Sequence, residues 1–167
     1  VRGALLQPTL CEPATSPVEK VERAMLDKHV ALIAQAAERG AQVVCLQELF
    51  YGPYFCAEQQ TKWYDLVERI PDGPTTKLMC ELAKKHNMVL VVPIYEEEIS
   101  GLYYNTASVI DADGTYLGKF GIVDAMIRKC RTHHAHFEIR EIRELYRHCE
   151  VPLGEGHAQQ VAGGERV

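Results

Sequence analysis

Three mainly apolar segments alternate with two segments of helical periodicity, and this order constrains the fold more than any other feature. The apolar segments are GALLQ (3–7), AQVVCLQ (41–47) and MVLVVPIYEEE (88–98). Apolar runs of this length are typical of strands that are covered on both faces. Strands that alternate with helices predict an α/β fold in which the helices pack on a sheet.

The two helical segments carry start and stop signals. The first runs from Pro17 to Gly40, with Ser16 expected as its N-cap and Glu19 completing a capping box. The second covers residues 72–87, with Pro74 in its first turn and basic residues in its last. Helical spacing predicts a core-facing stripe on the first helix formed by Val21, Met25, His29, Leu32 and Ala36. Residues 102–120 predict two further strands around the turn DADG.

Composition excludes several classes of function. The chain has 167 residues, which suits one domain, and a net charge of −5, which does not favour binding to nucleic acid or to an anionic membrane. Its apolar runs are shorter than the roughly 20 residues that cross a bilayer. Six cysteines without CxxC spacing indicate reduced thiols, so we expect a cytoplasmic protein.

Glu48 stands where the apolar run 41–47 ends, directly before Leu49, Phe50 and Tyr51. In open α/β sheets, ligand sites gather at the carboxyl ends of the strands. Apolar neighbours are expected to desolvate this carboxylate partly, which would make it a stronger base. The alternative is a structural role, in which Glu48 caps a loop or pairs with a lysine. We interpret Tyr103, Tyr104 and Asn105 as residues that pack within a strand with a polar end, rather than as substrate contacts.

Three segments carry a family resemblance: VVCLQELFYGPYF, PDGPTTKLMCELAKKHNMVLVVPIYE and YYNTASVIDADGTYLGKF. In order and spacing they resemble the nitrilase (carbon–nitrogen hydrolase) superfamily over about residues 2–120. The most similar branch is that of N-carbamoyl amidohydrolases, such as N-carbamoylputrescine amidase, an enzyme of polyamine biosynthesis, and β-ureidopropionase.

The resemblance implies a fold and a mechanism. The fold would be part of a nitrilase-like α-β-β-α sandwich, in a family whose members form homo-oligomers. The mechanism would be hydrolysis of an N-carbamoyl amine or a related linear amide by a Glu–Lys–Cys triad, without metal or other cofactor. Glu48 matches the family's general base, which activates a thiol while a lysine stabilises the oxyanion.

The other two members of the triad have no clear match. The family's lysine should lie three residues after Lys119, where this chain has Ile122. Lys129 in RKC (128–130) could be the oxyanion lysine after an insertion, or part of a solvated basic turn. Neither Cys130 nor Cys149 follows an apolar strand, so the nucleophile is left unknown.

The residue composition changes after Phe120, where Arg, Glu and His become frequent. We therefore divide the chain into a nitrilase-like portion, residues 1–120, and a divergent tail, residues 121–167, which a frameshift or aberrant splicing would explain. Residues 137–149 could form a helix. The three histidines of THHAH (132–136) are interpreted as a solvated cluster rather than a metal site. A truncated, inactive fragment that acts at most in binding or oligomerisation is the rival to an active hydrolase.

Overall fold

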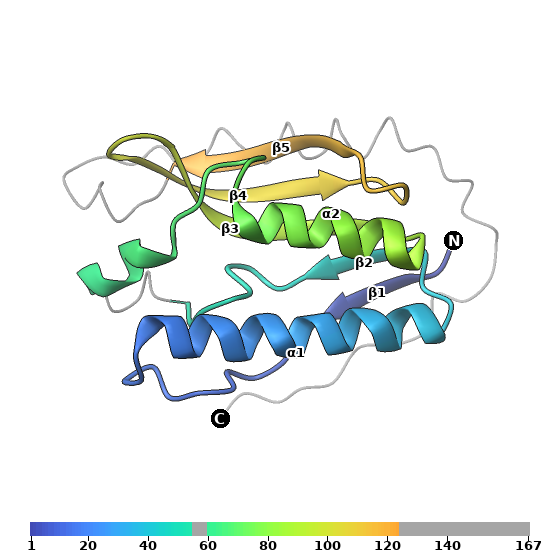
Figure 1. Ribbon diagram of the computed structural model, residues 1–167, viewed down its shortest axis with the longest axis horizontal. Coiled ribbons are helices and arrows are strands. Elements are labelled where there is room, and N and C mark those ends of the chain that lie inside the picture. Colours follow the sequence, from blue (N-terminus) through green and yellow to red (C-terminus); the bar gives the residue numbers. More distant parts are fainter. Residues whose placement is uncertain (55–59, 124–167) are drawn as a thin grey trace, which may run out of the picture. The chain divides into compact units, whose positions relative to one another are not determined.

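The computed structural model describes residues 1–54 and 60–123, all of which belong to one compact unit, Val1–Cys130. The first half of this unit alternates strands with helices: β1 (Gly3–Leu6), α1 (Val18–Glu38), β2 (Val43–Leu46), the 3₁₀ helix η2 (Thr61–Leu66) and α2 (Pro74–His86). Three strands follow without a helix between them: β3 (Val89–Ile99), β4 (Leu102–Ile110) and β5 (Tyr116–Val123) (Figure 1).

The five strands form one sheet in the order β1-β2-β3-β4-β5. The first three strands are parallel, because an α-helix returns the chain to the same end of the sheet each time. The last two are antiparallel to their neighbours, because short turns connect them. The predicted α/β class and the predicted order of elements are therefore confirmed.

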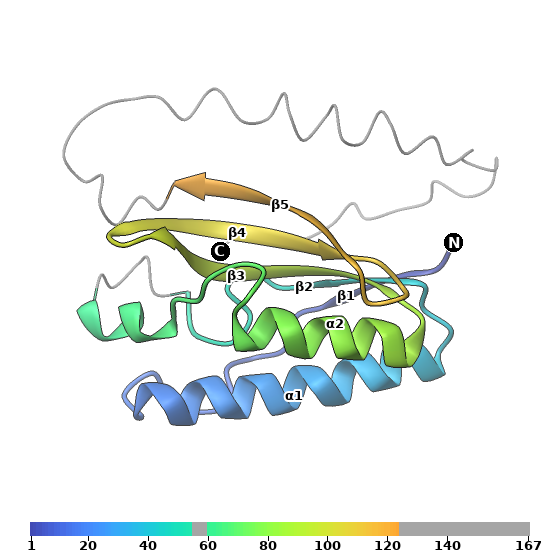
Figure 2. The same ribbon diagram turned by 45° about the horizontal axis from the view of Figure 1, so that its top comes forward.

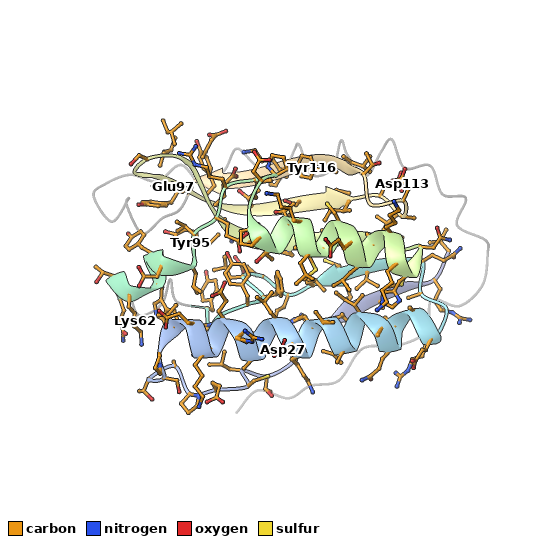
Figure 3. All side chains as sticks on the ribbon, in the orientation of Figure 1. Asp27, Lys62, Tyr95, Glu97, Asp113 and Tyr116 are labelled. Atoms are coloured by element: carbon orange, nitrogen blue, oxygen red, sulfur yellow. The ribbon has the colours of Figure 1, made fainter. Side chains whose placement is uncertain are left out.

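Both α-helices pack on the same face of the sheet (Figure 2). Val44, Leu90 and Val92 point from the central strands into this layer, where Met25 of α1 and Met79 of α2 are also fully buried. Burying side chains of this size contributes roughly 1.5–3 kcal/mol each. Side chains fill the space between the helices and the sheet (Figure 3), so this layer is the hydrophobic core.

The opposite face of the sheet carries no helix from the part of the chain described here. Side chains alternate between the two faces along a strand, and directly paired residues share a face. Leu5, Cys45, Val91 and Val109 are paired in one row across four strands. Leu5 is 76% exposed, and the other three are half-buried. We refer to this side of the sheet as the open face.

The first helix differs in detail from its prediction. It begins at Val18, so its N-cap is Pro17, and no side-chain cap hydrogen bond forms. The predicted capping box of Ser16 and Glu19 is therefore wrong, since the backbone enters the helix one residue later. In the predicted stripe Leu32 is only half-buried, and its neighbour Ile33 is the buried residue.

The predicted helix over residues 137–149 and the THHAH cluster lie outside the described residues. Within the described ranges, neither α-helix combines the length and the apolar character that a bilayer crossing requires.

Candidate functional site

Glu48 lies just beyond β2, at the carboxyl end of the parallel strands, as the sequence predicts. The three residues after it are almost fully buried, whereas Glu48 itself is exposed. Leu49 adopts a positive φ of 49°, which turns the chain sharply after the carboxylate. The expectation that apolar neighbours desolvate Glu48 is therefore wrong, because Leu49, Phe50 and Tyr51 turn into the core and leave the carboxylate outside.

Tyr51 anchors the turn that carries Glu48. Its hydroxyl donates to the carbonyl oxygen of Leu66 at 3.1 Å and accepts the backbone N–H of Tyr95 at 2.7 Å. Burial raises the pKa of Tyr51 well above its usual value, so the hydroxyl keeps the proton that it donates. Phe50 packs edge-on against the rings of Tyr51 and His29. Glu48 is thus held at the surface by a turn that the buried side chains of Phe50 and Tyr51 fix to the core.

Asn105 of β4 contacts the candidate base directly. Its Nδ2 atom donates a hydrogen bond of 2.5 Å to Oε1 of Glu48. Asn105 pairs with Tyr95 in the β-ladder, two rows from the pair of Val91 with Val109, so it belongs to the open face. Tyr95 lies at this end of the sheet beside η2, where its ring packs against Tyr64 (Figure 3). The sequence interpretation of Asn105 as strand packing missed this contact, because residues 48 and 105 are brought together only by the sheet.

The backbone register identifies what lies beside this pair. Position 122 of β5, where the resemblance leads us to expect a lysine, is paired directly with Asn105 and holds Ile122. Lys119 is paired with Ser108, which is buried on the helix-covered face, so Lys119 and Asn105 belong to opposite sides of the sheet. Lys129, Cys130 and Cys149, the other candidates from the sequence, lie outside the described residues.

Lys119 instead takes part in a separate polar cluster. It forms an ion pair with Glu96 and a longer one, of 3.4 Å, with Glu98. Glu96 is only 2% exposed, and its other oxygen accepts the hydroxyl of Thr106 at 2.8 Å. Burial by itself would lower the pKa of Lys119, but the hydrogen bonds and charges of Glu96 and Glu98 outweigh it and raise that pKa. A protonated lysine held by two carboxylates suits a structural role.

The described thiols do not have the surroundings of a nucleophile. Cys45 and Cys80 are half-buried, and burial raises the pKa of each thiol. A raised pKa favours the protonated form, whereas a nucleophile must be a thiolate. Cys11 is an exposed free thiol in the loop before α1. The described ranges hold no group of three side chains that could bind a metal ion.

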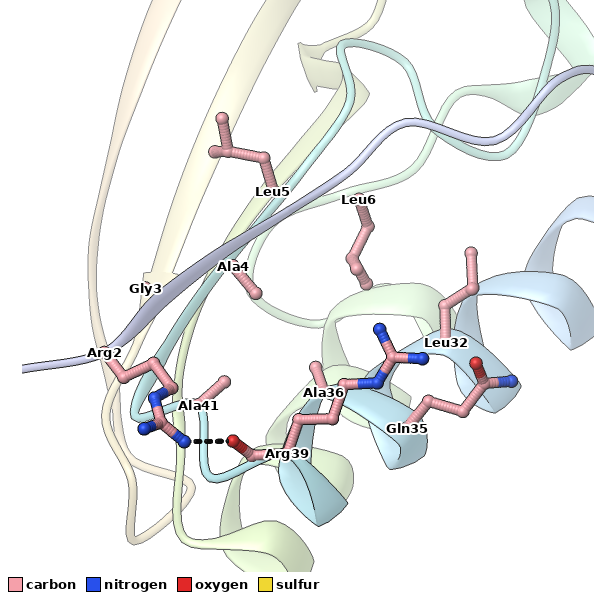
Figure 4. Close-up of a pocket in the computed structure, with 10 residues that line it drawn as sticks. All are labelled: Arg2, Gly3, Ala4, Leu5, Leu6, Leu32, Gln35, Ala36, Arg39 and Ala41. Atoms are coloured by element: carbon pink, nitrogen blue, oxygen red, sulfur yellow. Dashed lines mark hydrogen bonds between the residues drawn. The ribbon is translucent and has the colours of Figure 1, made fainter. Parts of the chain in front are cut away.

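A pocket lies beside the edge strand β1, between it and α1 (Figure 4). It is lined by β1 and the last turns of α1, with Leu6, Leu32 and Ala36 as apolar walls. Arg2 and Arg39 lie at its rim, where the guanidinium of Arg2 donates to the carbonyl oxygen of Arg39. This pocket contains none of the candidate catalytic residues.

The sheet topology and the carboxylate at the end of β2 define an α/β protein with a candidate site at the carboxyl end of its parallel strands. A sequence profile of the carbon–nitrogen hydrolase family matches residues 5–157. The chain therefore belongs to the carbon–nitrogen hydrolase family.

Individual relatives agree with this assignment. The chain is 36% identical to β-ureidopropionase of Arabidopsis thaliana over 121 residues, which are 71% of this chain and 29% of the relative. It is 38% identical to N-carbamoylputrescine amidase of Solanum lycopersicum, over 53% of this chain and 29% of the relative. It is also 38% identical to citrullinase of Francisella tularensis, over 57% of this chain and 33% of the relative. The chain thus spans about a third of the length of these relatives.

Solved structures show the same fold. A carbon–nitrogen hydrolase from Helicobacter pylori superposes with a TM-score of 0.60 at 29% identity, over 71% of this chain and 38% of that one. Nit3 of Saccharomyces cerevisiae, a member of the nitrilase superfamily, superposes with a TM-score of 0.51 at 22% identity, over 65% and 40% of the two chains. The second likeness shows the fold alone.

Proposed function

We propose that this chain carries the general-base half of an amidohydrolase site, with Glu48 as the base. The substrate class would be N-carbamoyl amines or related linear amides, which are small molecules. Hydrolysis would follow the Glu–Lys–Cys mechanism of the family: the base takes the proton of a thiol, the thiolate attacks the carbonyl carbon, and a lysine stabilises the oxyanion. No cofactor is needed for these steps.

One observation carries the proposal: Glu48 stands at the carboxyl end of β2 and accepts a hydrogen bond from Asn105 of β4. A base must be held in a fixed orientation so that its oxygen meets the proton it abstracts. The buried turn after Glu48 and the amide of Asn105 provide such a support. Three relatives bear the names of enzymes of this class: β-ureidopropionase, N-carbamoylputrescine amidase and citrullinase.

A second candidate is a catalytically impaired chain that acts in binding or oligomerisation. It is favoured by Ile122, which occupies the register position next to Asn105 where the mechanism would need a cation. An isoleucine cannot stabilise an oxyanion, so this chain would depend on Lys129 or on a lysine of another chain. The division into residues 1–120 and a divergent tail, 121–167, belongs to this second candidate and stays a prediction.

Ammonia release from N-carbamoylputrescine and from N-carbamoyl-β-alanine tests the proposal. The full chain is compared with Glu48→Gln, which keeps the size of the side chain and removes its basicity. General-base catalysis is worth roughly 10²–10⁴-fold, so the variant should lose at least about a hundredfold in rate. Glu98→Gln is the matched control, because Glu98 is an exposed carboxylate at the edge of the Lys119 cluster. Equal rates for the chain and for Glu48→Gln would remove Glu48 from the mechanism and favour the second candidate.

A further inference from the structure

We infer that Asn105 is a positioning residue that holds the carboxylate of Glu48 in one orientation and leaves its Oε2 atom as the proton acceptor. This inference rests on the proposed function for its chemical meaning. The contact itself is a property of the structure, so it can be tested even if the chain proves inactive.

The identity of the donor and acceptor atoms follows from their chemistry. An ionised carboxylate only accepts hydrogen bonds, so the amide of Asn105 must present its NH₂ group to Glu48. The bond joins Nδ2 of Asn105 to Oε1 of Glu48. Within the described residues, Oε2 of Glu48 accepts no hydrogen bond. Among the residues that the structure describes, the two oxygens are therefore unequal: Oε1 is engaged by Asn105, and Oε2 has its lone pairs available for an incoming proton.

The position of Asn105 makes this support rigid. Asparagine is depleted in strands, and here it lies in the interior of β4. Its backbone is paired with Tyr95 on one side and with Ile122 on the other, so the side-chain amide is attached to a strand that is held along both edges. Glu48 by contrast is exposed, and an exposed glutamate has several rotamers of similar energy. The hydrogen bond from Asn105 selects one of them.

This geometry fits Glu48 both before and after the proton transfer. When a thiol gives its proton to Oε2, the sulfur keeps the electron pair and Glu48 becomes a neutral acid. The carbonyl-like oxygen of that acid is then Oε1, which can keep the hydrogen bond from Nδ2 of Asn105. The same contact thus serves both protonation states without a change of rotamer.

The first test needs no activity. Crystal structures of the full chain and of Asn105→Ala compare the orientation of Glu48, and Val109→Ala, two rows away on the same face of β4, is the control. We expect one rotamer of Glu48 in the chain and in Val109→Ala, and several in Asn105→Ala. NMR of the side-chain amides gives a second measurement: Glu48→Ala should shift the NH₂ resonances of Asn105 and leave those of Asn87 unchanged. A single unchanged rotamer of Glu48 in Asn105→Ala would overturn the inference, as would an Asn105 resonance that ignores Glu48→Ala.

The second test uses the amidase assay. If the chain is active, Asn105→Ala should lower kcat about tenfold or more with KM within about twofold, since misplacement of a base acts on the transition state. Asn105→Asp has the same shape without the NH₂ donor, and it should lose at least as much. An active chain whose kcat is unchanged in both variants would overturn the inference. If Glu48→Gln is as active as the unaltered chain, the proposed function fails, and the orientation and NMR measurements still decide the role of Asn105.

Discussion

Lys119 of β5 forms an ion pair with Glu96 of β3 across the intervening strand β4. Thr106 of β4 donates to the other oxygen of the same carboxylate, so one buried group connects three strands. Breaking a buried ion pair typically costs about 3–5 kcal/mol, and the partial exposure of Lys119 reduces this. We predict that Glu96→Gln lowers the free energy of unfolding by about 2 kcal/mol, measured by urea denaturation. Glu98→Gln, which alters the longer and exposed pair, should change it by less than about 0.5 kcal/mol. Equal losses would contradict a special role of Glu96.

The buried carboxylate of Glu68 predicts a pH dependence of stability. It accepts the backbone N–H of Thr75 at 2.9 Å and also the Thr75 hydroxyl, at the first turn of α2. Burial raises the pKa of Glu68, although both Thr75 hydrogen bonds oppose this. The folded state then binds the proton of Glu68 more tightly than the unfolded state does. The stability that Glu68 contributes is therefore complete at a pH below its pKa in the unfolded state, and it is lost as pH rises through its pKa in the folded state.

Chemical denaturation from pH 4 upward measures this effect. Glu68→Gln should remove the part of the fall in stability that comes from this carboxylate. Thr75→Val removes a hydrogen bond that lowers the pKa of Glu68, so it should extend the fall to higher pH. A stability curve that keeps its slope in Glu68→Gln would assign the effect to another group, for example Glu22, whose pKa burial also raises.

His29 predicts a pH dependence of the opposite sign. Its ring is fully buried in α1, with Nδ1 at 2.8 Å from the carbonyl oxygen of Met25 and with Phe50 edge-on against it. Burial lowers the pKa of His29, and the hydrogen bond to Met25 opposes this only in part. The stability that depends on neutral His29 is therefore present above pH 6.5 and is lost as pH falls from there through the folded pKa.

Replacement of His29 tests this prediction in thermal melts between pH 5 and pH 8. His29→Leu should make the melting temperature less sensitive to acid over this range. Phe50→Leu removes the neighbouring ring but keeps the imidazole, so it should lower stability and keep the pH dependence. An unchanged acid sensitivity in His29→Leu would disprove the assignment.

The hydroxyl of Tyr51 is predicted to stabilise the turn that carries Glu48. Tyr51→Phe removes the acceptor of the Tyr95 N–H and the donor to Leu66. Loss of a buried hydrogen-bond partner costs about 1–3 kcal/mol, which urea denaturation would detect. Tyr64→Phe, at a half-buried ring of η2, is the control and should cost less than about 0.5 kcal/mol. A neutral Tyr51→Phe would mean that ring packing alone holds the turn.

The register of β5 predicts where a lysine would meet Glu48. Position 122 pairs with Asn105, and position 123 pairs with Tyr104 on the other side of the sheet. We expect Ile122→Lys to couple favourably with Glu48 by about 0.5 kcal/mol in a double-mutant cycle with Glu48→Gln. Val123→Lys is the matched control and should show no coupling. Equal coupling at both positions would contradict the register.

Much of the fold could be predicted because local pattern and tertiary environment agree. The run from Val43 to Leu46 predicts a strand covered on both faces; it does form a strand, but only Val44 and Leu46 are buried, while Val43 and Cys45 are half-buried. Gly40, with a φ of 77°, ends α1 as predicted. The capping box failed because the backbone of Pro17 is still extended, with a φ of −53° and a ψ of 142°, so Pro17 takes the N-cap position and the helix begins one residue later than predicted. The sequence alone does not give such one-residue shifts at helix ends.

Some features of the candidate site could likewise be predicted from the sequence, and others could not. The residues alone determined the class of fold, the place of Glu48 at the end of β2 and the isoleucine at position 122, because these depend on neighbours along the chain. Only the tertiary structure decided that Glu48 is exposed, that Asn105 donates to it, and that Lys119 belongs to the other side of the sheet. These relationships join residues from 23 to 57 positions apart, and the pairing of strands, which no local pattern encodes, brings them together.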